Sequence, residues 1–350
     1  MRVVVAGSGI SGVVAALRAR ALGNEVVLVS SGKSASSRSL GVVDVLGYLD
    51  GEELSSPEEG IKILVEREEE HPYSLLGVER VREALEFFRE VTARAGIPFR
   101  GSLEENIHIA TQFGTVKPTC LAPEKVYAGR VEEWSGKRVV ISGEEERNFS
   151  PGFVAASLSW LLPKLGLAGP RRIEAKGEGE LVLKPLRQLG NGENARALPL
   201  LGDGEQVVER LTEHAAEAGV RIVQDKISRA VVEGGELKAL VGRQSYAGDA
   251  FVLATGDWTG GGLVGMREPL LGLELVRVEG LAVKTPLPEG GHPYSRLGVK
   301  VDGNLSPFYR GEKILNVRVA GALLGGYDYC TEKSGWGVAI ATGYFAGGVR

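Results

Sequence analysis

The stretch that decides the fold is Gly7-Ser8-Gly9-Ile10-Ser11-Gly12, which directly follows the apolar run at residues 1–6. That run is short and rich in β-branched residues, which is typical of a strand buried on both faces of a sheet. An apolar segment with two arginines near its end follows the glycines at residues 13–24 and predicts a helix. A second apolar run occupies residues 25–29. The order strand, glycine loop, helix, strand predicts a βαβ unit at the start of the chain.

A Gly-x-Gly-x-x-Gly pattern between a buried strand and a helix is typical of dinucleotide-binding folds. Gly7 permits the tight turn, Gly9 lets a pyrophosphate approach the backbone, and Gly12 permits close packing of helix on strand. The N–H groups at the start of the helix, together with Ser8 and Ser11 in the loop, then bind the phosphates. The pattern therefore predicts a nucleotide cofactor.

The acid expected at the end of the second strand is missing. Such an acid binds the adenosine ribose hydroxyls, and here Ser30 and Ser31 stand in its place. A serine loses the charge-assisted contact, so either the nucleotide binds more weakly or it lacks adenosine altogether. Lys33 and Arg38 follow, and they are either phosphate ligands or solvated loop cations.

Two further glycine motifs favour a flavin over a nicotinamide. The first is Ala254-Thr255-Gly256, which ends an apolar strand. The second runs from Gly321-Ala322 through Gly325-Gly326 to Gly335-Trp336-Gly337, where a final helix is expected to begin. A helix N-terminus at the pyrimidine edge of a flavin stabilises negative charge on the reduced ring. The sequence predicts FAD or FMN, bound non-covalently.

Composition excludes several classes of protein. The chain has 350 residues, with 41 basic and 45 acidic side chains, so it lacks the basic excess of a nucleic-acid-binding protein. No apolar run reaches the roughly 18 residues that span a membrane. Two cysteines cannot form a disulfide framework or hold an iron–sulfur cluster alone, and no metal site is predicted.

Apolar strands return after a long irregular region, at residues 205–256 and again beyond residue 316. We therefore predict an α/β fold: a Rossmann-like FAD/NAD(P)-binding domain with a discontinuous α+β cap that binds substrate. The expected flavin domain comprises residues 1–60, 200–262 and 301–350. The expected cap comprises residues 61–199 and 263–300.

Five segments carry a resemblance that extends over nearly the whole chain: residues 31–35, 39–46, 71–77, 113–119 and 321–328. With these segments the sequence resembles the fumarate-reductase-type flavoprotein superfamily and, more narrowly, the B subunit of anaerobic glycerol-3-phosphate dehydrogenase. Serine at the position of Ser30 is typical of that family. The resemblance also implies that Ser39 and Gly41 contact the cofactor.

The resemblance implies a flavin-dependent oxidation of sn-glycerol 3-phosphate to dihydroxyacetone phosphate. It further implies a second flavoprotein subunit, an iron–sulfur subunit and a quinone-type acceptor. The chain is then expected in the cytoplasm, at the inner face of the membrane, with membrane contact only through its partners. Two alternatives stay open: a relay or scaffold subunit without chemistry of its own, and a stand-alone flavin oxidase of a small hydroxy or amino acid.

Alcohol oxidation needs a base for the hydroxyl proton. His108, which alternates with isoleucines in an expected strand, and His292, in a glycine- and proline-containing loop, are the candidates. Lys117 is the best candidate for a catalytic cation and for binding the substrate phosphate, with Arg38 and Arg296 as further phosphate ligands. His292 also opens a His-Pro-Tyr-Ser segment that repeats the one at residues 71–74, a match without matching flanks.

Overall fold

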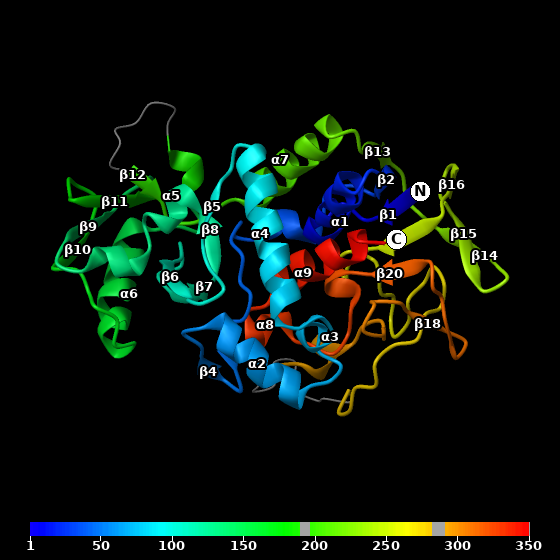
Figure 1. Cartoon of the computed structure of the whole chain (residues 1–350). Helices are drawn as coiled ribbons and strands as arrows, with labels where there is room; N and C mark the ends of the chain where they lie inside the picture. Colours follow the sequence, from blue (N-terminus) through cyan, green and yellow to red (C-terminus); the bar gives the residue numbers. More distant parts are fainter. Residues whose placement is uncertain (190–196, 282–290, 350) are drawn as a thin grey trace.

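The computed structural model describes residues 1–189, 197–281 and 291–349. It shows two lobes side by side (Figure 1). One lobe holds both chain ends and a five-stranded sheet, and the other holds the elements from β9 to β12 with helix α6.

The central sheet has the strand order β13-β2-β1-β17-β20, and all four pairings are parallel. Its strands draw on three distant parts of the chain, since they are β1 (Arg2–Ala6), β2 (Glu25–Ser30), β13 (Arg221–Gln224), β17 (Ala250–Leu253) and β20 (Val317–Val319). Val3 pairs with Val26 on one side and with Ala250 on the other. The three inner strands, β1, β2 and β17, are apolar and buried almost throughout without alternation, as in a parallel sheet covered on both faces, whereas the edge strands β13 and β20 contain polar side chains. The predicted α/β fold with a dinucleotide-type sheet is confirmed.

Two helices of the first lobe pack unusually closely. They are α1 (Ile10–Ala21) and α9 (Gly335–Gly347), which lies beside α1 against the sheet. A Cβ atom on Gly343 would overlap the Ser11 carbonyl, and one on Gly347 would overlap the Ala15 carbonyl. Two glycines one helical turn apart therefore let the backbones of α1 and α9 touch.

A small antiparallel sheet extends the first lobe after β13. It consists of β14 (Arg229–Glu233), β15 (Glu236–Val241) and β16 (Ser245–Ala247). The turn between the first two strands contains Gly234 and Gly235, both at positive φ, as a tight two-residue hairpin turn requires.

The second lobe is more regular than its sequence predicts. It has a parallel sheet in the order β10-β9-β11-β12, covered by α6 (Pro151–Lys164). The strands are β9 (Arg138–Ile141), β10 (Arg172–Ala175), β11 (Leu181–Lys184) and β12 (Ala197–Pro199). Strands of three or four residues are too short to show a period, which is why we expected irregular structure here. Trp134, Leu158 and Leu183 belong to the apolar core of this lobe.

The other elements connect the lobes or flank the sheets. The helices are α2 (Pro57–Arg67), α3 (Pro72–Leu76), α4 (Val78–Arg94), α5 (Glu124–Tyr127), α7 (Gly204–Glu217), α8 (Tyr329–Glu332), and the 3₁₀ turns η1 (Ala35–Arg38), η2 (Val131–Trp134), η3 (Leu186–Gln188), η4 (Pro293–Arg296) and η5 (Gly321–Leu323). The strands are β3 (Tyr48–Leu49), β4 (Glu52–Glu53), β5 (Phe99–Gly101), β6 (Ile107–Ala110), β7 (Val116–Thr119), β8 (Leu121–Pro123), β18 (Phe308–Tyr309) and β19 (Glu312–Lys313).

Helix α4 lies between the lobes in Figure 1 and packs against α9. Its buried side chains Val81, Leu85 and Phe88 belong to the same apolar core as the five-stranded sheet. The expected boundary at residue 61 assigns this helix to the cap, whereas its packing joins it to the flavin-type lobe. The division into domains stays a prediction.

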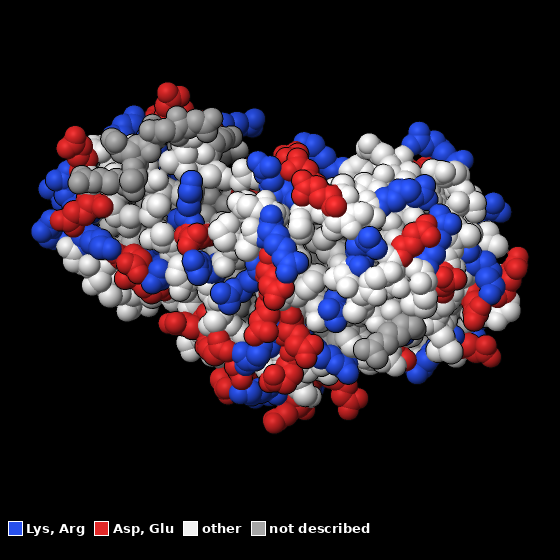
Figure 2. Space-filling model, turned by 45° about the horizontal axis from the view of Figure 1, so that its top comes forward, with Lys and Arg blue, Asp and Glu red and all other residues white. Residues whose placement is uncertain are grey.

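Charged side chains of both signs are interspersed over both lobes (Figure 2). Among the described residues, no helix is long and apolar enough to cross a bilayer. The same part of the chain contains no group of three or more His, Cys, Asp or Glu side chains that could hold a metal ion.

Candidate functional site

The first two sequence motifs meet at the carboxyl edge of the central sheet. Gly7 follows β1, and its N–H donates to the Val29 carbonyl at 2.9 Å. Ala254 follows β17, and its N–H donates to the Ala6 carbonyl at 2.8 Å. Strand β1 lies between β2 and β17, where the order of strands along the sheet reverses. Open parallel sheets bind their ligands at this kind of position.

The three glycines of the loop have different surroundings. Gly7 has φ +111°, and a Cβ atom there would overlap the Ala254 carbonyl. A Cβ atom on Gly12 would overlap the carbonyl of Gly7 itself. Gly9 is different, because a Cβ atom there would meet only serine side chains, the nearest being the Ser36 Oγ atom at 3.3 Å. The fold requires Gly7 and Gly12, whereas Gly9 leaves the start of α1 accessible.

The N-terminus of α1 is suited to an anion. Its first turn contains no acidic residue. Its N-cap residue is Gly9, which has no side chain that could cap the helix. The Ile10 N–H donates to the Ser36 Oγ atom at 3.2 Å, and the Ser8 and Ser30 hydroxyls share a 2.6 Å hydrogen bond. No sequence motif singles out Ser36, although the run of serines after β2 is a signal that could have indicated it.

A cavity of about 440 Å³ lies at the end of β2, where the adenosine half of a dinucleotide is expected. The residues that line it are Ser30, Ser31, Gln224, Asp225, Lys226, Ser228, Gly242 and Arg243. Asp225 lies beside Ser30 because β13 pairs with β2, but its carboxylate is already engaged. It accepts hydrogen bonds from the Tyr246 hydroxyl at 2.7 Å and from the Lys226 N–H at 2.8 Å. These hydrogen bonds, the one from Tyr246 above all, lower the pKa of Asp225.

The motif after β17 contains a hydroxyl group that forms no hydrogen bond with the described residues. The Thr255 hydroxyl is buried and has no hydrogen-bond partner among the described residues. Gly256 has φ +77°, and Gly321 from the third motif has φ +71° with Ser11 directly beside it. An orphaned hydroxyl after β17, a helix N-terminus after β1 and a cavity at the end of β2 fit a bound dinucleotide.

The rest of the third motif is explained by packing. A Cβ atom on Gly325 would overlap Val276, and one on Gly326 would overlap the Glu70 carbonyl. A Cβ atom on Gly337 would overlap the Tyr73 hydroxyl. The Gly337 N–H donates to the Asp44 carbonyl at 2.9 Å. Contact of these glycines, and of their neighbours Ala322, Gly335 and Trp336, with a flavin stays a prediction.

The segment after Ser31 packs against the start of α7. Gly41 has φ +63°, and a Cβ atom there would lie 2.7 Å from the Asp203 carbonyl carbon. The Ser39 hydroxyl donates to the Ser36 carbonyl at 2.8 Å. Lys33 forms an ion pair with Glu205, which raises the pKa of Lys33, and Arg38 is exposed. Lys33 is therefore engaged away from the phosphate-binding loop.

His108 lies on β6, as predicted, but its ring is held by two acids. Nδ1 lies 2.7 Å from Glu132 Oε1, and Nε2 lies 2.7 Å from Glu53 Oε1. The hydrogen bond with Glu132 and the neighbouring charges raise the pKa of His108 above its usual value. A general base needs a free ring lone pair, so this arrangement argues against His108 as the base.

Lys117, on β7, forms an ion pair with Asp44, and both side chains are largely buried. The Thr119 hydroxyl donates to the other carboxylate oxygen of Asp44 at 3.0 Å. Burial raises the pKa of Asp44, and the Lys117 charge opposes that shift. Lys117 therefore neutralises a buried carboxylate in this structure. This pairing argues against Lys117 as a ligand of the substrate phosphate.

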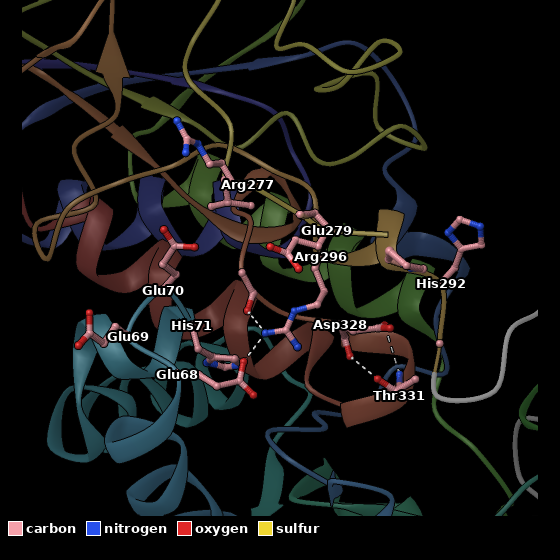
Figure 3. Close-up of a pocket in the computed structure, with 15 residues that line it drawn as sticks. Glu68, Glu69, Glu70, His71, Arg277, Glu279, His292, Arg296, Asp328 and Thr331 are labelled. Carbon is pink, nitrogen blue, oxygen red and sulfur yellow. Dashed lines mark hydrogen bonds and ion pairs between the residues drawn. The ribbon is translucent and has the colours of Figure 1, made fainter. Parts of the chain in front are cut away.

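A second cavity, of about 500 Å³, contains Arg296 and His292 (Figure 3). The Arg296 guanidinium pairs with Glu68 and donates to the Gly326 carbonyl at 2.9 Å. The carboxylates that line the cavity (Glu68, Glu69, Glu70, Glu279, Asp328) outnumber its two guanidiniums, on Arg277 and Arg296. A phosphate dianion would be repelled here, so this cavity does not fit the substrate phosphate.

The repeated His-Pro-Tyr-Ser segments share one local structure. His71 and His292 each accept a hydrogen bond at Nδ1 from the tyrosine N–H two residues on, at 3.0 and 3.2 Å, and each starts a short helix. An Nδ1 that accepts leaves the proton of a neutral ring on Nε2. His292 therefore offers a donor and no free lone pair, and its ring points away from the cavity in Figure 3.

The structure thus brings the first two glycine motifs and Ser30 to one edge of the central sheet. Of the residues expected around the substrate, His108 and Lys117 lie on the paired strands β6 and β7, whereas Arg38 lies on η1 and Arg296 on η4. The FAD binding domain family matches residues 2–275, more than half of the chain. The chain belongs to this family of flavoproteins, and its cofactor is FAD.

Over nearly its whole length the chain is similar to curated relatives that share one name, the B subunit of anaerobic glycerol-3-phosphate dehydrogenase. The relative from Vibrio cholerae is 28% identical, and the match covers 98% of this chain and 95% of the relative. The one from Halobacterium salinarum, whose name is given as probable, is 29% identical, over 99% and 96%. The Vibrio alignment spans 420 positions, so at least 70 of them have no residue in this shorter chain of 350.

Solved structures match at lower identity. An open flavocytochrome c3 fumarate reductase matches with a TM-score of 0.49 and 11% identity, over 99% of this chain and 77% of that one. The 3-ketosteroid-Δ4-(5α)-dehydrogenase of Rhodococcus jostii RHA1 matches with a TM-score of 0.46 and 15% identity, over 99% and 95%.

Proposed function

We propose that this chain is the FAD-binding subunit of a complex that oxidises sn-glycerol 3-phosphate to dihydroxyacetone phosphate. Electrons then leave through partner subunits, one a second flavoprotein and one with iron–sulfur clusters, to a quinone-type acceptor. The observation that carries the proposal is the row of nucleotide-binding features at the carboxyl edge of the sheet, in a chain similar end to end to the B subunits. The partners would supply all membrane contact, at the inner face of the membrane.

Each part of that edge would hold one part of FAD. The Gly9 N–H group would bind the pyrophosphate, with Ser8 beside it, and the Ile10 N–H would join it by exchanging the Ser36 hydroxyl, to which it donates in this structure, for a phosphate oxygen. Ser30 would bind the ribose hydroxyls, and the adenine would lie in the cavity next to it. The Thr255 hydroxyl would donate to the flavin half. Bound FAD supplies the hydride acceptor for alcohol oxidation.

A second candidate function follows from the substrate residues. Lys117 and Arg296 are each paired with an acid, and His108 lies between two acids. A chain whose candidate catalytic groups are all engaged suits a relay subunit, in which a partner oxidises the substrate and this FAD only passes electrons on.

Anaerobic spectroscopy separates these functions. We would load the purified chain with FAD and add sn-glycerol 3-phosphate, with the sn-1 enantiomer as the matched control. Bleaching by the natural substrate alone supports catalysis by this chain. Bleaching only after the partner subunits are added supports the relay. Fast turnover with oxygen by the isolated chain supports an oxidase and contradicts both.

A further inference from the structure

One tyrosine of the third glycine motif has a buried hydroxyl without a partner. Tyr327 is 2% exposed, and its hydroxyl forms no hydrogen bond with the described residues. Among those residues, Thr255 has the one other buried hydroxyl in this condition. Native proteins satisfy nearly all buried hydroxyls, because an unsatisfied one costs roughly 1–3 kcal/mol. An acceptor from outside the chain is therefore expected at Tyr327.

The Tyr327 hydroxyl lies near the loop that follows β17. Tyr327 stands between η5 and α8, and its ring centre is 6.3 Å from that of Tyr329. The Tyr329 hydroxyl donates at 2.9 Å to Asp257, the residue that directly follows Ala254-Thr255-Gly256. Burial raises the pKa of Tyr327 well above its usual value, and its neighbours Glu332, Tyr329 and Asp257 add to the shift. The hydroxyl therefore keeps its proton and can donate it in a hydrogen bond.

The polar groups beside Tyr327 are paired with one another. The Glu332 carboxylate accepts from the Ser334 hydroxyl and from the Asp328 N–H, each at 2.8 Å. It also lies 3.3 Å from His71 Nε2, which carries the proton of the neutral ring. Burial favours the neutral form of Glu332, yet these hydrogen bonds, that of His71 above all, lower its pKa overall. The network is complete without the Tyr327 hydroxyl.

The order of the strands puts the flavin half of FAD on the same side of the sheet. The pyrophosphate would lie at the start of α1, which follows β1, and the adenosine at the end of β2. Strands β17 and β20 lie on the other side of β1. A dinucleotide that crosses the edge of the sheet at β1 therefore directs its second half toward the segments that follow β17 and β20. Thr255 and Tyr327 belong to these two segments.

We propose that the Tyr327 hydroxyl donates a hydrogen bond to the polar edge of the flavin ring. The inference rests on the FAD site of the proposed function and adds a residue to it. The carbonyl oxygens and nitrogens of that edge are hydrogen-bond acceptors, and a donor there stabilises the added electron density of the reduced ring. Tyr327 thus raises both the affinity for FAD and the reduction potential of the bound cofactor.

Tyr327→Phe removes the hydroxyl alone and affects the FAD-free and FAD-loaded chains differently. We expect the FAD-free variant to unfold at the wild-type temperature or above it, because an unsatisfied group is lost. We expect the dissociation constant for FAD to rise roughly three- to ten-fold, the effect of one lost hydrogen bond. Thermal unfolding followed by circular dichroism and fluorescence titration with FAD measure these two quantities.

Tyr73 is the matched control, because it is also fully buried but its hydroxyl is paired. That hydroxyl donates to the Val45 carbonyl at 2.7 Å. Tyr73→Phe should therefore lower the unfolding temperature of the FAD-free chain and change the affinity for FAD less than about two-fold.

The reduction potential of bound FAD locates the contact on the ring. We would measure it anaerobically against a reference dye, and we expect a lower potential in Tyr327→Phe than in the wild type. Unchanged affinity would overturn the proposal, and so would weaker binding at an unchanged potential, because the contact would then lie outside the ring. A FAD-free Tyr327→Phe chain less stable than the wild type would also overturn it, because the hydroxyl would already be bonded. A wild-type chain that binds no FAD would instead contradict the proposed function, and this proposal with it.

Discussion

The Asp225 carboxylate accepts a 2.7 Å hydrogen bond from the hydroxyl of Tyr246. Asp225 directly follows the strand next to β2, so it is the acid nearest to the place where a ribose-binding carboxylate is missing. Together with the N–H groups of Lys226 and Arg243, the tyrosine commits that carboxylate to joining β13 to the small antiparallel sheet. The adenosine cavity therefore has no free acid among its described lining residues.

The first prediction concerns that role of Asp225. We expect Asp225→Asn to lower the stability of the chain at neutral pH while FAD affinity stays within about two-fold of wild type. Because the pKa of Asp225 is lowered in the folded chain, its contribution is present above the usual aspartate pKa and is lost as the pH falls through the folded value. Thermal unfolding of both proteins across acidic pH tests this. Unchanged stability with weakened FAD binding would instead make Asp225 a ribose ligand.

The second prediction restores the missing acid. Ser30→Glu should strengthen FAD binding roughly ten-fold, because a carboxylate forms charge-assisted hydrogen bonds to ribose hydroxyls. Ser31→Glu adds the same charge at the exposed neighbouring position and should change the affinity far less. Fluorescence titration of the FAD-free proteins measures both. Equal affinities for the two variants would show that the ribose does not lie at Ser30.

The third prediction is a pH dependence at His108. Its folded pKa is raised by Glu132 and Glu53, so its stabilising effect is complete below the usual histidine pKa and is lost as the pH rises through the folded value. We expect His108→Gln to cost about 1–2 kcal/mol near pH 6 and almost nothing near pH 9. His214→Gln, on α7, is the control, because His214 is 3.8 Å from its acid. A catalytic His108 would instead show a loss of turnover with unchanged stability.

The fourth prediction separates structure from catalysis at Lys117. Lys117→Met leaves the buried Asp44 carboxylate without its cation and should cost about 3–5 kcal/mol of stability. The double variant Asp44→Asn with Lys117→Met should recover much of that loss, because no unpaired charge is left. Denaturant unfolding measures both. A raised KM for sn-glycerol 3-phosphate at unchanged stability would identify Lys117 as a phosphate ligand instead.

The nucleotide edge was predictable because its signals are local. Gly7, Gly9 and Gly12 must stand between one strand and one helix, and the strand ending just before Ala254 is an uninterrupted apolar run. The pairing partners of a single histidine or lysine are not local: Glu53 and Glu132 reach His108 from 55 and 24 residues away. The same holds for Asp44 and Lys117, 73 residues apart, and for Arg296 and Glu68. A lone cation in a sequence therefore looks available, although in the fold it is paired.

The same reasoning explains the third glycine motif. Gly325, Gly326 and Gly337 resemble ligand-binding glycines in sequence, yet each faces backbone or side chains from the region between residues 44 and 298. Close packing and close ligand approach both require glycine, and the sequence alone does not distinguish them.

The claim that the glycine loop at residues 7–12 holds FAD is tested most directly by titrating the FAD-free chain with FAD. We predict saturable 1:1 binding by the wild type. Gly9→Val should stay folded, because its new side chain meets only serine side chains, yet lose at least about ten-fold in affinity by filling the approach of the pyrophosphate. Gly303→Val, at an exposed glycine with open space around it, should bind as the wild type does. A folded Gly9→Val protein that binds FAD with unchanged affinity would contradict the account.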